Sequence, residues 1–302
     1  MLTLLFLLFL GAAALAIEAV LRLSRSSYSL GDSRGPGEWA FIAIALAAVL
    51  LFSRYVARVD SLQFVARYVM LWRRTLKGFL LTFGATMLFA AAGYLALAAL
   101  GYVQWSQAAW ENLRSDIVEK SAIALLIVLV LASVEETIFR AFLLRYLRRN
   151  DTFWVTVGAV VVSSAIFSVS HLVALIDVWH LIGKASLLTG LFLIGLLLGT
   201  VYVVTGSLAC SIGVHCGLLG FKVILIRTDV INLVPDWLVN DDIRRSPLAW
   251  LVFLAATLAI VLWRRRLHEA FRVETAVCPD GDGEFKLPAR PSARAAPAGA
   301  RP

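Results

Sequence analysis

Charged residues are scarce in this 302-residue chain, at 16%, whereas hydrophobic residues make up 60% and the mean hydropathy is +0.83. Soluble globular domains contain about 25% charged and about 45–50% apolar residues. The composition therefore excludes an ordinary soluble domain and predicts an integral membrane protein. Cysteine is also scarce: Cys210 and Cys216 diverge on one predicted helix and Cys278 lies in the tail, so we interpret all three as structural thiols.

The chain shows no internal repeat and no basic stripe with interleaved aromatic residues. A transporter is one alternative, because transporters also place Glu, Arg and His within their helices. Transporters more often show two repeated halves, so we rank this alternative low. The missing stripe argues against nucleic acid as a partner. We interpret the formal charge of +8 as membrane topology and contact with anionic lipid headgroups.

Long apolar runs predict an all-α, polytopic membrane protein with about eight transmembrane helices, since a helix needs roughly 20 apolar residues to span a bilayer. The predicted helices are 2–21, 39–57, 78–101, 121–146, 153–176, 184–205, 207–227 and 247–263. No basic segment precedes the first run, which favours a transmembrane helix over a signal peptide. The basic tail, 271–302, has a Pro, Ala, Gly and Arg composition that predicts disorder.

The distribution of Lys and Arg between the loops predicts that both termini are cytoplasmic. The chain is divided in this interpretation into N-terminal transmembrane helices with an interfacial segment, a core that carries the motifs described below, a last transmembrane helix and the tail. These four parts cover residues 1–115, 116–230, 231–270 and 271–302.

The stretch "SVEETIFR", residues 133–140, places three charges inside an apolar segment. On an α-helix Glu136 stacks on Arg140, while Glu135 faces elsewhere, so we expect the two carboxylates to address different targets. A buried structural cluster, or an arginine that snorkels to the surface, is the alternative interpretation. Because an ionisable side chain in hydrocarbon costs roughly 2.5–3.5 kcal/mol, a functional role is favoured.

Two later helices each carry a polar stripe that ends in a histidine. The stripes are Ser164, Ser168 and His171, and Ser207, Ser211 and His215. A lone histidine on an apolar helix is often a satisfied core residue, but two of them at the ends of serine stripes point to function. We expect Glu135, His171 and His215 to converge in a water-containing cavity within the membrane.

These motifs resemble the type II CAAX prenyl protease family, also called the CPBP or Abi family of glutamic intramembrane proteases. Its Glu-Glu-x-x-x-Arg motif matches Glu135, Glu136 and Arg140. Its Phe-x-x-x-His motif matches Phe167 and His171. Its His-x-x-x-Asn motif matches only at His215, because residue 219 is leucine. The resemblance covers roughly residues 120–222.

The resemblance implies an intramembrane endopeptidase that cleaves a membrane-associated protein or peptide with a glutamate-activated water. Glu135 would be the general base, His171 would hold the water and His215 would stabilise the oxyanion. Glu136, Arg140 and Phe167 would support them. No cofactor is implied, although Glu135, His171 and His215 are also a ligand set that zinc sites use. The expected location is the cell membrane of a prokaryote.

Leu219 departs from the family pattern, because leucine cannot supply the amide donor that asparagine would offer to the oxyanion. Losing such a donor commonly costs about 10²–10³ in rate. Ser211 or a backbone N–H would replace it, the chain would belong to a divergent subgroup, or proteolysis would be lost. A non-catalytic membrane scaffold or immunity protein of the same fold is therefore the main alternative function.

Overall fold

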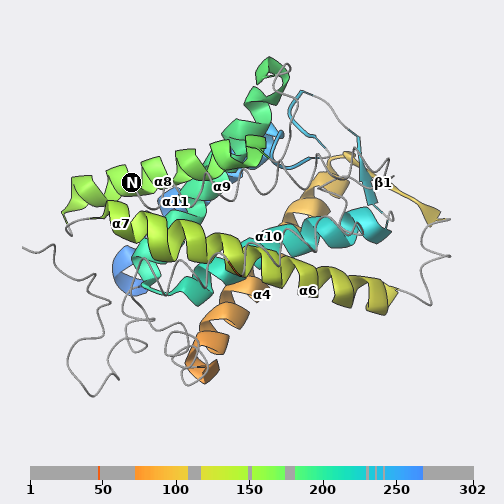
Figure 1. Cartoon of the computed structure of the whole chain (residues 1–302). Helices are drawn as coiled ribbons and strands as arrows, with labels where there is room; N and C mark the ends of the chain where they lie inside the picture. Colours follow the sequence, from red (N-terminus) through yellow and green to blue (C-terminus); the bar gives the residue numbers. More distant parts are fainter. Residues whose placement is uncertain are drawn as a thin grey trace, which may run out of the picture.

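The computed structural model describes residues 47, 72–107, 117–148, 152–173, 181–228, 231–234, 237–240 and 242–267. Within this part the chain is mostly helical (Figure 1). The helices are α4 (Trp72–Ala99), α6 (Ile117–Glu136), η1 (Thr137–Leu144), α7 (Arg145–Leu147), α8 (Phe153–Val173), α9 (Leu181–Thr205), α10 (Leu208–Thr228) and α11 (Pro247–Leu262). Two short strands, β1 (Val103–Trp105) and β2 (Ile231–Leu233), pair antiparallel.

The six later helices expected from the sequence are found close to their predicted bounds. The run 121–146 becomes α6, η1 and α7, and the other five correspond to α4, α8, α9, α10 and α11. The predicted helix 2–21, the predicted helix 39–57 apart from residue 47, most of the interfacial segment 59–77 and the tail 271–302 lie outside the described residues. The all-α expectation is correct for the bulk of the described chain, to which the structure adds the small β1–β2 pair.

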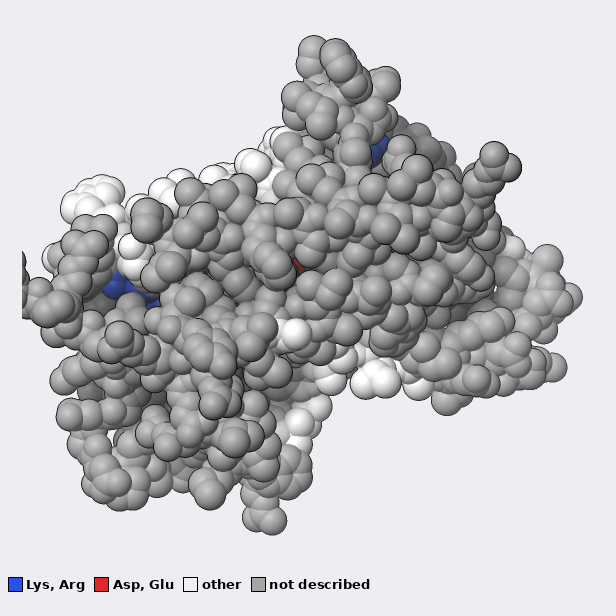
Figure 2. Space-filling view, in the orientation of Figure 1, with Lys and Arg blue, Asp and Glu red and all other residues white. Residues whose placement is uncertain are grey.

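Four described helices are long and apolar enough to cross a membrane. They are Leu76–Ala99, Phe153–His171, Ala185–Thr205 and Leu208–Leu225, and the shorter apolar helix is Pro247–Leu262. The predicted number of eight spans is therefore not confirmed. Among the described residues visible in Figure 2, an acidic side chain shows near the centre of the view and basic side chains show nearer its edges.

The helix that carries the Glu-Glu-x-x-x-Arg motif changes its winding directly after Glu136. Residues Thr137–Leu144 form a π-helix, which the apolar pattern did not predict. π-helical turns are rare and occur frequently at functional sites. The hydroxyl of Ser163 on α8 donates to the Phe139 carbonyl of this segment at 3.0 Å, so a side chain from the neighbouring helix contributes to its backbone hydrogen bonding.

Glycines allow the helices around the motifs to approach closely. A methyl group on Gly213 would lie 2.6 Å from the Phe79 carbonyl oxygen, and one on Gly217 would lie 2.6 Å from the Thr86 Cβ. Small residues at such spacing let membrane helices pack backbone to backbone. The extensive α4–α10 contact follows from this packing, and Figure 1 shows α4 crossing α10.

The turn between α9 and α10 is tight and fixes where α10 begins. Gly206 has φ +66°, a conformation that glycine adopts without a steric penalty. The Ser207 N–H donates to the Thr205 hydroxyl at 3.2 Å, and the Ser207 hydroxyl accepts from the Cys210 N–H at 3.4 Å. Ser207 therefore caps α10, and the two polar residues that follow on this helix, Ser211 and His215, are set relative to α9.

Candidate active site

Glu136 is the buried centre of the charged cluster, with none of its surface exposed. Its Oε1 lies 2.9 Å from His215 Nδ1. Its Oε2 accepts from the Ser211 hydroxyl at 2.5 Å and lies 3.2 Å from Arg140 Nε. A carboxylate buried in apolar surroundings is stable only when it is paired and hydrogen-bonded, and these three partners meet that condition.

Arg140 extends from η1 into the core, where it is 1% exposed. Its Nη2 donates to the Gly195 carbonyl of α9 at 3.3 Å. Its guanidinium carbon lies 4.8 Å from the centre of the Phe167 ring, within the range of a cation–π interaction. The close approach of α9 depends on Gly195, since a methyl group there would lie 2.9 Å from the Ser164 Cβ. The predicted Glu136–Arg140 pair is therefore formed and tied to α9.

Glu135 lies beside two imidazoles. Its Oε1 is 3.8 Å from His171 Nε2, and its Oε2 is 3.7 Å from His215 Nε2. Its side chain is 30% exposed, in contrast to the buried Glu136. Polar atoms separated by more than 3.5 Å are commonly bridged by water. The structure thus brings together the three side chains that the sequence nominated, from α6, α8 and α10, and leaves Glu135 accessible.

The two histidines have their Nδ1 atoms fixed by different acceptors. His171 Nδ1 lies 2.8 Å from the Phe167 carbonyl, which can only accept, so this nitrogen carries the hydrogen. His215 Nδ1 lies 2.9 Å from Glu136 Oε1, and the carboxylate likewise accepts. Both rings consequently present Nε2 toward Glu135.

The prediction that Glu135 and Glu136 address different targets is wrong. Both carboxylates contact the ring of His215, Glu136 at Nδ1 and Glu135 at Nε2. The physical reason is that an imidazole ring has two nitrogens on different edges. A single ring beside α6 can therefore contact both Glu135 and Glu136, although their side chains point in different directions from the helix. The prediction that Glu136 faces Arg140 is correct.

Phe167 is the apolar side chain around which the site packs. It is 1% exposed, and its ring centre lies 5.1 Å from that of Phe139 and 4.6 Å from that of His171. The ring of His215 is 6.2 Å away. Because Arg140 covers the same ring, Phe167 holds both histidines and the arginine in a fixed arrangement.

Most serine hydroxyls of the two stripes bond to backbone groups of helices and not to the charged cluster. The Ser164 hydroxyl donates to the Val160 carbonyl of its own helix at 2.7 Å, and that of Ser168 donates to the Leu188 carbonyl of α9 at 2.7 Å. Ser211 is the exception, and its role differs from that of an oxyanion donor, one alternative that the sequence left open. Its hydroxyl is directed to Glu136, so it is not the replacement oxyanion donor. Its position one turn before His215 was the sequence signal for a partner of the site.

Leu219 lies one turn beyond His215 and packs against an apolar cluster. The cluster consists of Val128, Ala132 and Cys216, with Phe79, Phe83, Ile212 and Val223 beside them. The described residues contain no group of three or more His, Cys, Asp or Glu side chains that could hold a metal ion.

A comparison with protein-family models matches residues 118–219 to the family described as type II CAAX prenyl endopeptidase Rce1-like. This segment is similar to that family. The match spans roughly a third of the chain and contains every nominated site residue, from Glu135 to His215. It confirms the resemblance inferred from the motifs. No curated protein and no solved structure matches the chain.

The four apolar helices indicate a multi-pass membrane protein, and its residues 118–219 are similar to a family of membrane endopeptidases. The matched segment ends at Leu219, the residue at which the chain departs from the expected His-x-x-x-Asn motif. The match therefore includes this departure from the expected motif.

Proposed function

We propose that the protein is an intramembrane endopeptidase in which Glu135 activates a water molecule to hydrolyse a peptide bond of a membrane-associated protein or peptide. The observation that carries this proposal is the position of the accessible Glu135 carboxylate, 3.8 Å from His171 Nε2 and 3.7 Å from His215 Nε2. A general base must reach its proton directly or through one water. The separations suit a water held between these groups.

His171 and Glu135 would hold the attacking water in this mechanism. The His171 Nδ1–H is used by the Phe167 carbonyl, so the neutral ring offers a lone pair at Nε2. The water donates one hydrogen to that nitrogen and the other to the Glu135 carboxylate. As the new C–O bond forms, Glu135 takes the second proton. It returns this proton to the leaving amine nitrogen when the C–N bond breaks.

His215 would stabilise the oxyanion in its protonated form. With Nδ1–H donating to Glu136, only the imidazolium has a hydrogen left at Nε2 to offer. The two carboxylates of the cluster then face two cations, Arg140 and His215, so the cluster carries no net charge. Glu136 is accordingly a positioning residue that holds the ring through Nδ1. With leucine at position 219, this Nε2–H is the side-chain donor proposed for the oxyanion.

The proposal also covers the membrane location, the extent of the catalytic core and the cofactor. The enzyme lies in the cell membrane of a prokaryote with both termini cytoplasmic, and the basic loops contact anionic headgroups. Residues 116–230 form the catalytic core. The reaction needs no cofactor, and zinc bound by Glu135, His171 and His215 is the competing chemistry.

Purified protein in lipid nanodiscs, incubated with a library of membrane-anchored peptides, tests the proposal by mass spectrometry of the new termini. We expect cleavage by the native chain and none above background by Glu135→Gln, with equal folded yield. Glu119→Gln, near the start of α6, is the matched control and should cleave like the native chain. Equal cleavage by all three proteins would contradict the role of Glu135.

A non-catalytic relative of the same fold is the second candidate, and the apolar surroundings of Leu219 favour it. In that case neither the native chain nor any variant cleaves the library. Recovery of an intact peptide bound equally by the native chain and by Glu135→Gln would then identify a binding protein.

A further inference from the structure

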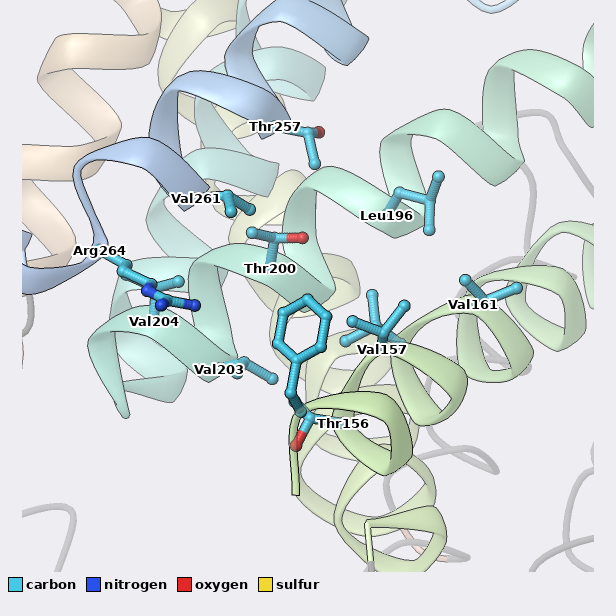
Figure 3. Close-up of a pocket in the computed structure, with 12 residues that line it drawn as sticks. Thr156, Val157, Val161, Leu196, Thr200, Val203, Val204, Thr257, Val261 and Arg264 are labelled. Carbon is cyan, nitrogen blue, oxygen red and sulfur yellow. The ribbon is translucent and has the colours of Figure 1, made fainter. Parts of the chain in front are cut away.

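An apolar cavity lies between α8, α9 and α11, away from the charged cluster. Its volume is about 450 Å³, within the range of roughly 300–1,000 Å³ that is usual for small-molecule sites. Valines make up half of its lining residues, three threonines add hydroxyl groups, and Arg264 supplies a charge. Figure 3 shows Arg264 beside Val204 at one end of the cavity, with Val161 and Leu196 at the other.

The cavity walls suit hydrocarbon rather than a polar molecule. The Thr257 hydroxyl already donates to the Phe253 carbonyl of its own helix at 2.8 Å, so it does not require a ligand. Val157 and Val161 are 39% and 41% exposed, which leaves the cavity open along α8. An apolar chain that enters from the surrounding bilayer would bury these side chains.

Among the described residues that line the cavity, the only charge is positive. No Asp or Glu lines the cavity, and no carboxylate pairs with Arg264 in the described part of the chain. Arg265 and Arg266 follow it and are exposed. A cation at the mouth of an apolar cavity is complementary to a molecule with a hydrocarbon chain and an anionic head.

The aromatic residues around this end of the cavity place it at the level of lipid headgroups. Trp154 follows the cavity residue Phe153 and is 79% exposed, and Trp263 precedes Arg264 and is 65% exposed. Tryptophan and arginine gather at membrane–water interfaces, where the ring or cation reaches the headgroups. The apolar walls then extend from the interface toward the hydrocarbon.

We propose that this cavity binds one anionic phospholipid, with an acyl chain between α8, α9 and α11 and the phosphate beside Arg264. The site is formed by residues outside the charged cluster, so it does not depend on the proposed peptidase activity. Its wall includes Val160, which packs with the fully buried Leu144 at the end of η1. A bound lipid would therefore stabilise the packing at that end of the π-helix.

Native mass spectrometry of the full chain, titrated with phosphatidylglycerol or phosphatidylcholine of identical acyl chains, tests this proposal. We expect one phosphatidylglycerol to bind the native chain in preference to phosphatidylcholine. Arg264→Gln should weaken phosphatidylglycerol by about fivefold, the factor for one cation at an anionic surface, and leave phosphatidylcholine unchanged. Arg266→Gln, which removes the same charge from a residue outside the cavity lining, is the control and should bind like the native chain.

Val157→Trp tests the apolar half of the site, because the exposed position tolerates a larger ring that fills the cavity. We expect loss of tight binding of both lipids, with the thermal midpoint in lipid-free detergent retained. Equal binding of the two lipids, equal losses in Arg264→Gln and Arg266→Gln, or unaltered binding to Val157→Trp would overturn the proposal. Displacement of the lipid by inorganic phosphate alone would also overturn it, because a simple anion site would then be sufficient.

Discussion

Removing the Ser211 hydroxyl should destabilise the protein more than removing any serine hydroxyl that bonds only to its own helix. Ser211 has no exposed surface, and its hydroxyl donates to the ionised Glu136 at 2.5 Å. Hydrogen bonds to charged groups contribute about 1.5–3 kcal/mol, compared with about 0.5–1.5 kcal/mol for neutral pairs. Ser211→Ala leaves Glu136 with Arg140 and His215, so we expect a loss of about 2 kcal/mol rather than complete unfolding.

Ser164→Ala is the matched control. Ser164 is 1% exposed, loses the same oxygen atom, and its hydroxyl donates to the Val160 carbonyl of its own helix. Such bonds to the preceding turn contribute little to a helix and can slightly destabilise it. We therefore expect a change of less than about 0.5 kcal/mol for Ser164→Ala.

Thermal midpoints in one detergent at one scan rate measure the difference. At about 2–4 °C for each kcal/mol, Ser211→Ala should melt several degrees lower than Ser164→Ala. If Glu136 positions His215, Ser211→Ala should also reduce kcat more than it changes KM, because the oxyanion interaction forms in the transition state.

Equal midpoints for the two alanine variants would refute the argument that the buried Glu136 depends on Ser211. A lower midpoint with unchanged kcat would refute the link from Glu136 to His215. Ser211→Cys, which keeps a weak donor in nearly the same volume, should fall between the native chain and Ser211→Ala.

The other predictions concern Arg140, the metal question, position 219 and Asp242. Arg140→Ala should lower the folded yield in membranes, because it leaves Glu136 buried without its cation, and normal yield would contradict this. Dialysis against a chelator should leave cleavage intact; loss of cleavage that zinc alone restores would show a metal enzyme. Leu219→Asn should raise kcat more than KM and lower the thermal midpoint, since an amide enters an apolar cluster; a reduced midpoint without a gain in kcat would refute the missing-donor idea. Burial alone would raise the pKa of Asp242, but the hydrogen bond from Arg244 and the nearby cation of Lys222 lower this pKa overall. The ionised Asp242 therefore stabilises the protein above about pH 4, and this stabilisation is lost as the pH falls below that value. Asp242→Asn should therefore lower the midpoint at pH 7 and make little difference in strong acid, and an equal deficit at both pH values would contradict this.

The sequence alone determined where the described helices lie and which of their polar residues were candidates for a shared site. Apolar runs are local signals, because a helix in a bilayer satisfies its backbone within one segment, so the bounds of α8, α9 and α10 were close to their predicted values. The pairing of Glu136 with Arg140 was also predictable, since residues four apart meet on one helix face. The motif order along the chain was sufficient to indicate the resemblance that the match to residues 118–219 confirmed.

Only the tertiary structure decided how those residues meet. The rotation of α10 against α6 turns His215 so that both adjacent carboxylates contact it, and the same rotation commits Ser211 to Glu136. The π-helical winding after Glu136 likewise has no signature in the apolar pattern. The rotation of a helix and its approach to a neighbour depend on packing between segments that are distant in the sequence, as in the contact that Gly195 allows with α8. The hydropathy along one helix does not specify this packing.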